Sequence, residues 1–334
     1  MQFTSPRLSG SQRLSGLAKS RSVGDPARAS DLLEGPVVAI LNPSAGTARE
    51  ADWLREELAS ITDAEIRATE KAGDGIRMAR EAVAGGAALL IAAGGDGTLH
   101  EIANGMAPDF DRCALALIPM GTGNDTARSL GLPLDPEQAL KLLAEGRLGA
   151  IDLMRIDHDG STTYALNAAT GGMGGQVNES MPEDIKDRWG PLAYARAAAS
   201  VLPDLPVHEV TIEVDGDNRA NLQLVSLVVA NGEFAARGVC VAPGARVSDG
   251  SLSVHAILDS SLPELLSLIP PILRGDVPEH DNYLHWRCKS LRVKASEGMS
   301  LSADGELIEA TDMEFSVLPG ALRVLGAASE QTEA

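Results

Sequence analysis

Several features that define common protein classes are missing from this chain of 334 residues. No stretch has the roughly 18 consecutive apolar residues of a membrane-spanning helix, and the longest candidate, residues 262–273, is interrupted by Pro263, Pro270 and Pro271. The three cysteines and six histidines lack the spacing of metal ligands. These absences exclude a disulfide scaffold and a histidine-based metalloenzyme, and they favour a cytoplasmic protein.

Positive charge is also scarce, because 28 Lys and Arg residues stand against 47 Asp and Glu residues, for a net charge of −19. This balance disfavours nucleic acid as a partner and weakens attraction to anionic lipid head groups. Residues 1–36 differ, with five basic and three acidic side chains in a segment rich in Ser, Arg and Gly. The segment lacks the apolar stretch of a secretory signal, and we expect it to be disordered.

The two commonest glycine-rich nucleotide motifs are absent as well, since neither Gly-x-x-x-x-Gly-Lys-Ser/Thr nor Gly-x-Gly-x-x-Gly occurs. The chain instead has Gly94-Gly95-Asp96-Gly97 directly after residues 87–93, an apolar run typical of a buried parallel strand. Glycines at the carboxyl end of such a strand let backbone N–H groups approach a phosphate closely. Because Asp96 repels a phosphate, it implies a magnesium ion or a hydroxyl or amide group that needs an acceptor.

Two further loops follow apolar runs in the same way. Residues 37–41 lead into the loop 42–46, and residues 114–118 lead through the loop 119–125 into a helical pattern. Helix N-termini at the carboxyl edge of a parallel sheet bind anions readily. Three strand-to-helix loops therefore converge on one sheet edge, which predicts a site for nucleotide phosphates.

The pattern of the chain changes near residue 149. From residue 37 to 148, β runs alternate with helical patterns, which predicts an α/β nucleotide-binding domain with a parallel sheet. Residues 149–326 contain β runs with few helices, which predicts a β-rich, mainly antiparallel second domain. We expect residues 327–334 to form a short tail.

Five motifs, in order between about residue 37 and residue 326, resemble the diacylglycerol kinase catalytic-domain family. Bacterial soluble lipid kinases and sphingosine kinases share this domain, and NAD kinases are distant relatives. The motifs are NPSAG (42–46), GGDGTLHEIANG (94–105), PMGTGNDTA (119–127), APGARVSDGSLSV (242–254) and ADGELIE (303–309). The resemblance implies ATP and Mg²⁺ as cofactors, a nucleotide cleft between the two domains, and a last β segment that returns to the first domain.

The resemblance also implies a set of residues that contact ATP. They are Asn42, Pro43, Ser44, Ala45, Gly46, Thr69, Gly94, Gly95, Asp96, Gly97, Thr98, Leu99, Glu101, Gly121, Thr122, Gly123, Asn124 and Asp125. For Thr69 the sequence alone indicates a helix-capping residue equally well.

Glu306 is the expected general base, with Asp96 and Asp304 as further catalytic residues. Asp304-Gly305-Glu306 resembles the proton-accepting turn of the family, although Asp-Gly is also a common hairpin signal. By the same resemblance, Asp249 and the backbone carbonyls of Arg246 and Ser251 are expected to bind a structural magnesium ion. A second magnesium ion is expected beside the phosphates.

The resemblance thus implies a magnesium-dependent lipid kinase that phosphorylates a diacylglycerol-like hydroxyl, with sphingoid bases and other lipid alcohols still open. The expected partners are ATP, a lipid alcohol, a transiently contacted membrane surface and a second copy of the chain. An NAD kinase and a non-catalytic nucleotide-binding regulator are the alternatives. His100 stands where many members have asparagine, and we leave it outside the expected site. Residues 191–202 and 262–273 are candidates for an acyl-binding surface.

Overall fold

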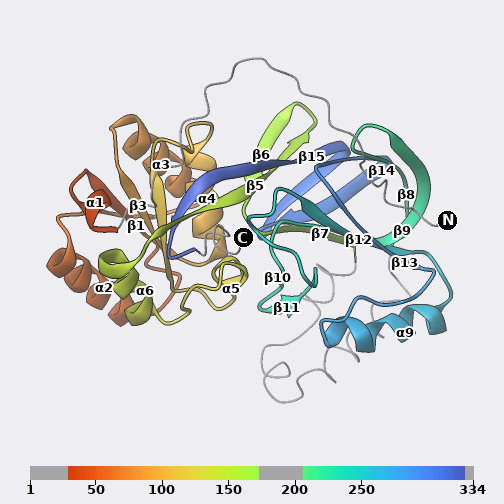
Figure 1. The fold of residues 1–334 in the computed structure, drawn as a ribbon, viewed down its shortest axis with the longest axis horizontal. Coiled ribbons are helices and arrows are strands. Elements are labelled where there is room, and N and C mark those ends of the chain that lie inside the picture. The colour runs from red at the N-terminus through yellow and green to blue at the C-terminus, as the bar shows by residue number, and fades with distance from the viewer. Residues whose placement is uncertain (1–28, 173–205, 328–334) are drawn as a thin grey trace, which may run out of the picture.

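The computed structural model describes residues 29–172 and 206–327. Our expectations for residues 1–28, 191–202 and 328–334 lie outside the described residues. Two units follow one another along the chain, and Figure 1 shows the first on the left, in red to yellow, and the second on the right, in green to blue.

The first unit alternates strands and helices, as predicted. Its elements are α1 (Ala29–Leu33), β1 (Val37–Leu41), α2 (Ala48–Ile61), β2 (Glu65–Ala68), α3 (Asp74–Ala84), β3 (Leu89–Gly94), α4 (Asp96–Met106), β4 (Ala114–Pro119), α5 (Asp125–Ser129) and α6 (Pro136–Glu145). Strands β2, β1, β3 and β4 pair in this order, and all three pairings are parallel. This arrangement confirms the α/β class of the first unit.

Helices cover both faces of this parallel sheet, and strand β1 illustrates how. Val38 and Ile40 belong to the same buried cluster as Ile102 of α4, whereas Ala39 and Leu41 belong to a second cluster with Leu54 of α2. Successive side chains of a strand point to opposite faces of its sheet. A strand buried on both faces must therefore be apolar throughout, which explains the continuous apolar runs in the sequence.

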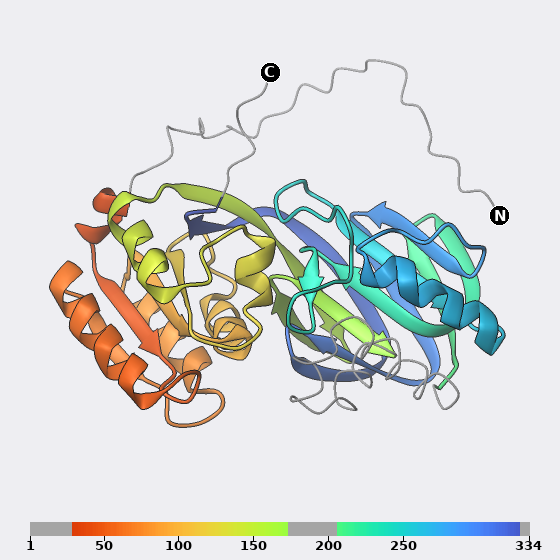
Figure 2. The ribbon, with the colours of Figure 1, turned by 90° about the horizontal axis from the view of Figure 1, so that it is seen from below.

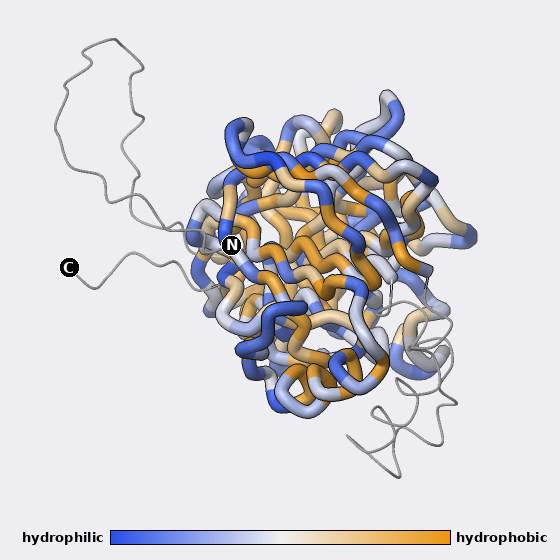
Figure 3. Tube along the Cα trace, turned by 90° about the vertical axis from the view of Figure 1, so that its right-hand side faces the viewer, coloured by the Kyte–Doolittle hydropathy of each residue, from blue (hydrophilic) through white to orange (hydrophobic). Residues whose placement is uncertain are grey.

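The second unit is β-rich and mainly antiparallel, which confirms that part of the predicted class. Its elements are β5 (Leu148–His158), β6 (Ser161–Ala165), β7 (Ala168–Gly172), β8 (His208–Val214), β9 (Asn218–Ala230), β10 (Phe234–Ala235), β11 (Val239–Cys240), β12 (Leu252–Leu258), α9 (Leu262–Leu273), β13 (Tyr283–Cys288), β14 (Ser290–Ala303) and β15 (Glu306–Leu325). In Figure 3 hydrophobic segments gather in the middle of the view, and many hydrophilic segments lie toward its edge.

Strand β15 joins the two units into one continuous sheet. It pairs antiparallel with β14 and β5, and near its end Val324 pairs parallel with Leu115 of β4. Figures 1 and 2 show β5 and β15 running side by side from one unit to the other. The chain therefore returns to the first unit after building the second. Within the described residues, no helix is both long and apolar enough to cross a bilayer.

Candidate active site

The loops that follow β3 and β4 touch through glycines. A Cβ atom on Gly121 would lie 2.7 Å from the Cα atom of Gly95, and one on Gly94 would lie 2.6 Å from the hydroxyl oxygen of Thr98. Real Cβ atoms do not approach other atoms so closely, so larger residues at these positions would push the loops apart. The glycines thus let the ends of two strands and the start of α4 meet, so that main chain rather than side chains lies where they meet.

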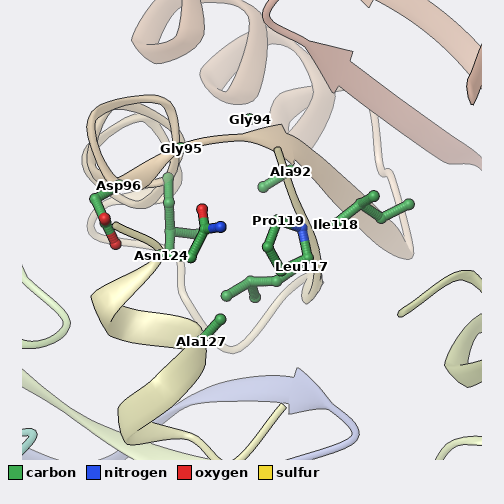
Figure 4. Close-up of a pocket in the computed structure, with 10 residues that line it drawn as sticks. Ala92, Gly94, Gly95, Asp96, Leu117, Ile118, Pro119, Asn124 and Ala127 are labelled. Atoms are coloured by element: carbon green, nitrogen blue, oxygen red, sulfur yellow. The ribbon is translucent and has the colours of Figure 1, made fainter. Parts of the chain in front are cut away.

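Asp96, the first residue of α4, ties these loops together. Its carboxylate accepts hydrogen bonds from the main-chain N–H groups of Asp125 and Thr126, each at 3.2 Å. These N–H groups belong to the first turn of α5, where no partner exists within the helix. Figure 4 shows Asp96 at the start of α4, facing α5. Of the two roles that the sequence left open for Asp96, the structure contains the acceptor of amide hydrogen bonds.

Asn124 and Asp125 fix the loop after β4 from both sides. Asn124 has a left-handed backbone, with φ 50°, and its side chain bonds both main-chain groups of Gly121, at 3.1 and 2.7 Å. The Asp125 carboxylate accepts from the N–H groups of Arg237 and Gly238 in the second unit, at 2.8 and 2.5 Å. Burial raises the pKa of Asp125, and the nearby charge of Asp96 adds to this rise. The loop is therefore attached to the second unit through a desolvated carboxylate.

The loop after β1 joins the same cluster. Asn42 donates from Nδ2 to the hydroxyl of Thr98 at 3.0 Å, and its Oδ1 accepts from the N–H of Ser44 at 2.9 Å. A Cβ atom on Gly46 would lie 3.4 Å from the Cε of Met120, so this loop borders the one after β4. Three of the predicted phosphate-contacting loops are thus neighbours.

Thr69 and Glu101 take different places from the glycine loops. The N–H of Thr69 donates to the carbonyl of Leu41 at 2.9 Å, and the residue that caps α3 is Gly73, so Thr69 is not a helix cap. The Glu101 carboxylate accepts from the N–H groups of Gly73 and Gly75, at 2.7 and 2.8 Å. Glu101 therefore braces the start of α3 against α4.

The predicted catalytic turn connects β14 to β15. The side chain of Asp304 is only 1% exposed, and its carboxylate accepts from the N–H groups of Leu166 at 2.6 Å, Asn167 at 3.1 Å and Ala168 at 3.0 Å. Glu306, by contrast, is exposed. Its Oε1 atom lies 3.8 Å from the position of a Cβ atom on Gly97. Glu306 is thus available for chemistry beside the phosphate loop, whereas Asp304 is occupied by the main chain.

A cleft between the two units, with a volume of ≈ 320 Å³, is lined by the loops after β3 and β4 and by part of the turn between β14 and β15, but not by Glu306 or the loop after β1. Its lining comes from both units and includes Gly95, Asp96, Gly121, Thr122, Gly123, Asp125, Thr126, Asn167, Ala168, Thr170, Arg237, Ser302, Asp304 and Gly305. Sequence reasoning missed Asn167, whose Oδ1 accepts from the hydroxyl of Ser129 at 2.7 Å. An asparagine inside an apolar β run was the available signal, because a buried amide requires partners.

The predicted metal loop lies between β11 and β12, and its residues do not line this cleft. Asp249 accepts from the N–H and hydroxyl of Ser251, at 3.1 and 2.8 Å, and its Oδ2 is ion-paired with Arg287. Asp152 anchors the loop by accepting from the N–H of Gly250 at 2.7 Å. Among residues 29–172 and 206–327, no group of three or more His, Cys, Asp or Glu side chains could hold a metal.

The donor set of this loop nevertheless fits magnesium. A hard cation binds one or two carboxylates together with backbone carbonyl oxygens and water, so a cluster of acidic side chains is not required. The Oδ2 atom of Asp249 already meets a cationic group, and the Arg287 side chain is 49% exposed, so it can move into solvent.

Two family models match the chain. One is described as the diacylglycerol kinase catalytic domain and matches residues 36–156, and the other is described as the YegS C-terminal NAD kinase beta sandwich-like domain and matches residues 167–326. A protein of Pseudomonas fluorescens strain Pf-5, named probable lipid kinase YegS-like, is 37% identical over 262 residues, which cover 78% of this chain and 85% of the relative. A protein of the same name from Pseudomonas aeruginosa strain PAO1 is 36% identical over 259 residues, which cover 78% and 83%.

A crystal structure described as a diacylglycerol kinase from Bacillus anthracis strain Sterne has the same fold. Its TM-score is 0.68 at 24% identity, over 88% of this chain and 97% of the other. The words NAD kinase in the second family model describe a sandwich fold. The match to the diacylglycerol kinase catalytic domain and the two relatives, each more than a third identical, establish that the chain belongs to the diacylglycerol kinase catalytic-domain family as a lipid kinase-like member.

Proposed function

We propose that this chain transfers the γ-phosphate of ATP to the free hydroxyl of a diacylglycerol-like lipid. The observation that carries the proposal is the position of Glu306, whose carboxylate from the second unit lies beside Gly97 of the phosphate loop in the first. Phosphoryl transfer needs a phosphate cradle, neutralisation of charge and a group that receives the proton of the attacking hydroxyl. Residues of both units would supply these three parts.

The cradle would consist of the loops that end β1, β3 and β4. The glycines after β3 and β4 line the cleft, and the start of α4 adds the positive end of a helix dipole. Asp96 would hold the loop after β4 in place through its two accepted hydrogen bonds. Mg²⁺, when bound, neutralises phosphate charge, and Asp249 with the carbonyls of Arg246 and Ser251 would hold the structural ion.

Glu306 would act as the general base. The lipid hydroxyl gives its proton to the Glu306 carboxylate while its oxygen bonds to the γ-phosphorus, and the bond from that phosphorus to the bridging oxygen breaks to leave ADP. A positioned base of this kind contributes about 10² to 10⁴ in rate. Asp304 would act indirectly, because its three hydrogen bonds fix the turn that carries Glu306.

A lipid acceptor also requires contact with a membrane surface. Leu307 follows Glu306 directly and is 68% exposed, which places a large apolar side chain at the end of the strand that carries the base. The net charge of −19 opposes approach to anionic lipid. We therefore expect Leu307→Ser to raise the KM for lipid in zwitterionic vesicles while the KM for ATP stays constant. Equal KM values for lipid in the variant and the wild type would show that Leu307 does not contact the membrane.

The substrate class is tested by transfer of label from [γ-³²P]ATP to separate acceptors. Dioctanoylglycerol, sphingosine, monoacylglycerol, NAD and a no-acceptor control are incubated with the purified chain and Mg²⁺, and the products are resolved by thin-layer chromatography. The proposal predicts a labelled lipid that is strongest with dioctanoylglycerol. Label on NAD would identify an NAD kinase, and label on none of the acceptors, with nucleotide still bound, would indicate a non-catalytic regulator.

A further inference from the structure

His100 lies in the second turn of α4, only 5% exposed. Its Nδ1 atom is 3.9 Å from the Oδ2 atom of Asp304, and among the described residues this Nδ1 has no hydrogen-bond partner. A buried N–H group without an acceptor is unfavourable, because the hydrogen bonds that it makes to water in the unfolded chain are not replaced. The Asp304 carboxylate is a nearby acceptor, although 3.9 Å is longer than a hydrogen bond, so the two groups must approach for the bond to form.

His100 lies on the side of α4 that contacts the second unit. Gly97, His100 and Asn104 are spaced three and four residues apart, so they share one side of the helix. Gly97 faces Glu306, and Asn104 bonds both main-chain groups of Tyr164, donating at 2.8 Å and accepting at 2.9 Å. The helix that begins at the phosphate loop therefore meets the second unit along this side.

We propose that His100 is a positioning residue for the transfer reaction: its Nδ1–H donates to Asp304 in the working enzyme and fixes the Glu306 turn over the phosphate loop. This inference rests on the proposed function and adds a residue to it. Oδ2 of Asp304 already accepts from Leu166, and a carboxylate oxygen has a second lone pair for His100. The proposed bond requires the tautomer of His100 that carries a proton on Nδ1.

The position of this contact explains why it should matter for rate. Asp304 is two residues from Glu306, so a shift of the carboxylate moves the base. A displacement of about 1 Å at a reacting group can cost roughly 10² in rate. His100 would act entirely through Asp304 and Glu306, and it would not touch ATP.

Replacing His100 with asparagine or with glutamine distinguishes the effect of the Nδ1 donor from the effect of the volume of the ring. The amide nitrogen of asparagine can reach the place of Nδ1, whereas that of glutamine reaches the place of Nε2. We expect His100→Asn to keep kcat within about threefold of wild type and His100→Gln to lower kcat by about tenfold or more, with an unchanged KM for ATP in both. Turnover is measured with ATP and dioctanoylglycerol, alongside Tm.

A double variant tests whether His100 works through the base. If it does, His100→Gln combined with Glu306→Gln is no slower than Glu306→Gln alone, because the interaction is already lost. If the double variant instead shows the product of the two single reductions in rate, the positioning role is contradicted. Equal losses for His100→Asn and His100→Gln would also overturn it, because the ring as a whole would then be responsible.

A measurement on the wild-type chain covers the case in which His100→Gln fails to fold. With ¹⁵N-labelled histidine and the His100→Asn spectrum for assignment, the Nδ1 of His100 should have the chemical shift of a protonated nitrogen. An unprotonated Nδ1 would overturn the inference. A wild-type chain that labels no lipid would instead overturn the proposed function, whereas an active wild type with a fully active His100→Gln variant would overturn this inference alone.

Discussion

Asp304 and Ala168 bond each other twice: the N–H of Asp304 donates to the Ala168 carbonyl at 3.0 Å, and Oδ1 of Asp304 accepts from the Ala168 N–H at 3.0 Å. Oδ2 accepts from Leu166. In Asp304→Asn the new NH₂ group would oppose one of these N–H donors. We expect a loss of about 2–3 kcal/mol in the free energy of unfolding, measured by urea denaturation.

The matched control for this variant is Glu309→Gln. Glu309 lies in β15, the strand that follows the Asp304 turn, and it is exposed; its carboxylate accepts a 3.3 Å bond from the Ser300 hydroxyl. Exposed contacts of this kind contribute little, so its stability should change by less than about 0.5 kcal/mol. Equal stability of the Asp304 variant and this control would contradict the structural role of the Asp304 carboxylate.

Asp96→Asn should affect both turnover and stability. The asparagine oxygen can accept from only one of the two N–H groups, of Asp125 and Thr126, that the carboxylate now serves. We therefore expect a loss of about 1–2 kcal/mol in stability together with a large loss of kcat, because the loop after β4 becomes mobile beside the phosphates. Near wild-type transfer with an unchanged Tm would reduce Asp96 to an ordinary turn residue.

The magnesium assignment predicts opposite effects for the two members of one ion pair. Asp249→Ala should raise the Mg²⁺ concentration for half-maximal activity, and excess Mg²⁺ should restore part of the rate. Arg287→Gln should lower that concentration, because the guanidinium that competes for Asp249 is removed. Magnesium titrations of activity test both variants. Unchanged magnesium dependence in both would contradict the metal role of Asp249.

His255 predicts a pH dependence of stability. Its Nε2 and Nδ1 lie 2.9 Å from the Ser253 hydroxyl and 2.8 Å from that of Tyr283. Burial, with a smaller effect of the nearby His285, lowers the pKa of His255 from 6.5 to about 4. As the pH falls, His255 is therefore protonated in the unfolded chain before it is protonated in the folded chain. Its contribution to the free energy of unfolding is fully present above pH 6.5 and decreases as the pH drops toward 4, by at most about 3 kcal/mol.

His255→Gln should remove this part of the pH dependence. The variant is expected to be less stable at neutral pH, because one hydrogen bond is lost. Its midpoint of unfolding in urea should change less between pH 6.5 and 4 than that of the wild type. The half-buried His208, in β8, gives the control variant His208→Gln, which should keep the wild-type slope. Parallel curves for wild type and His255→Gln would contradict the account.

The parallel half of the fold was predictable from sequence, and the reason is burial on both faces. Strands β1, β3 and β4 are apolar throughout because helices cover each side, so they appear as uninterrupted apolar runs. The glycine loops at their ends were equally visible, since close backbone contact allows no side chain. These features depend on residues near one another in the chain.

The antiparallel half was harder to predict. Strands β14 and β15 extend far beyond the short β runs at residues 291–293 and 313–317, because pairing with neighbouring strands carries polar residues into them. Strands β6 and β7 are separated at Leu166 and Asn167, whose N–H groups donate to the Asp304 carboxylate. Contacts between residues more than 130 positions apart leave no local pattern.

The contact between His100 and Asp304 belongs to the same class of unpredictable features. Sequence alone marks His100 as a departure from the usual asparagine, but its partner is 204 positions away and becomes visible only once β14 and β15 are paired. The role of the Glu306 turn was suggested by motif, whereas its position over Gly97 required the fold.

The most direct test of the account is the rate of the chemical step in Glu306→Gln. Rapid-quench single turnovers with [γ-³²P]ATP and the best lipid acceptor measure phosphate transfer, and equilibrium binding and Tm are measured on the same preparation. The account predicts unchanged ATP affinity, unchanged Tm and a transfer rate reduced by about 10² or more. A folded Glu306→Gln chain whose transfer rate stays within about threefold of wild type would contradict it.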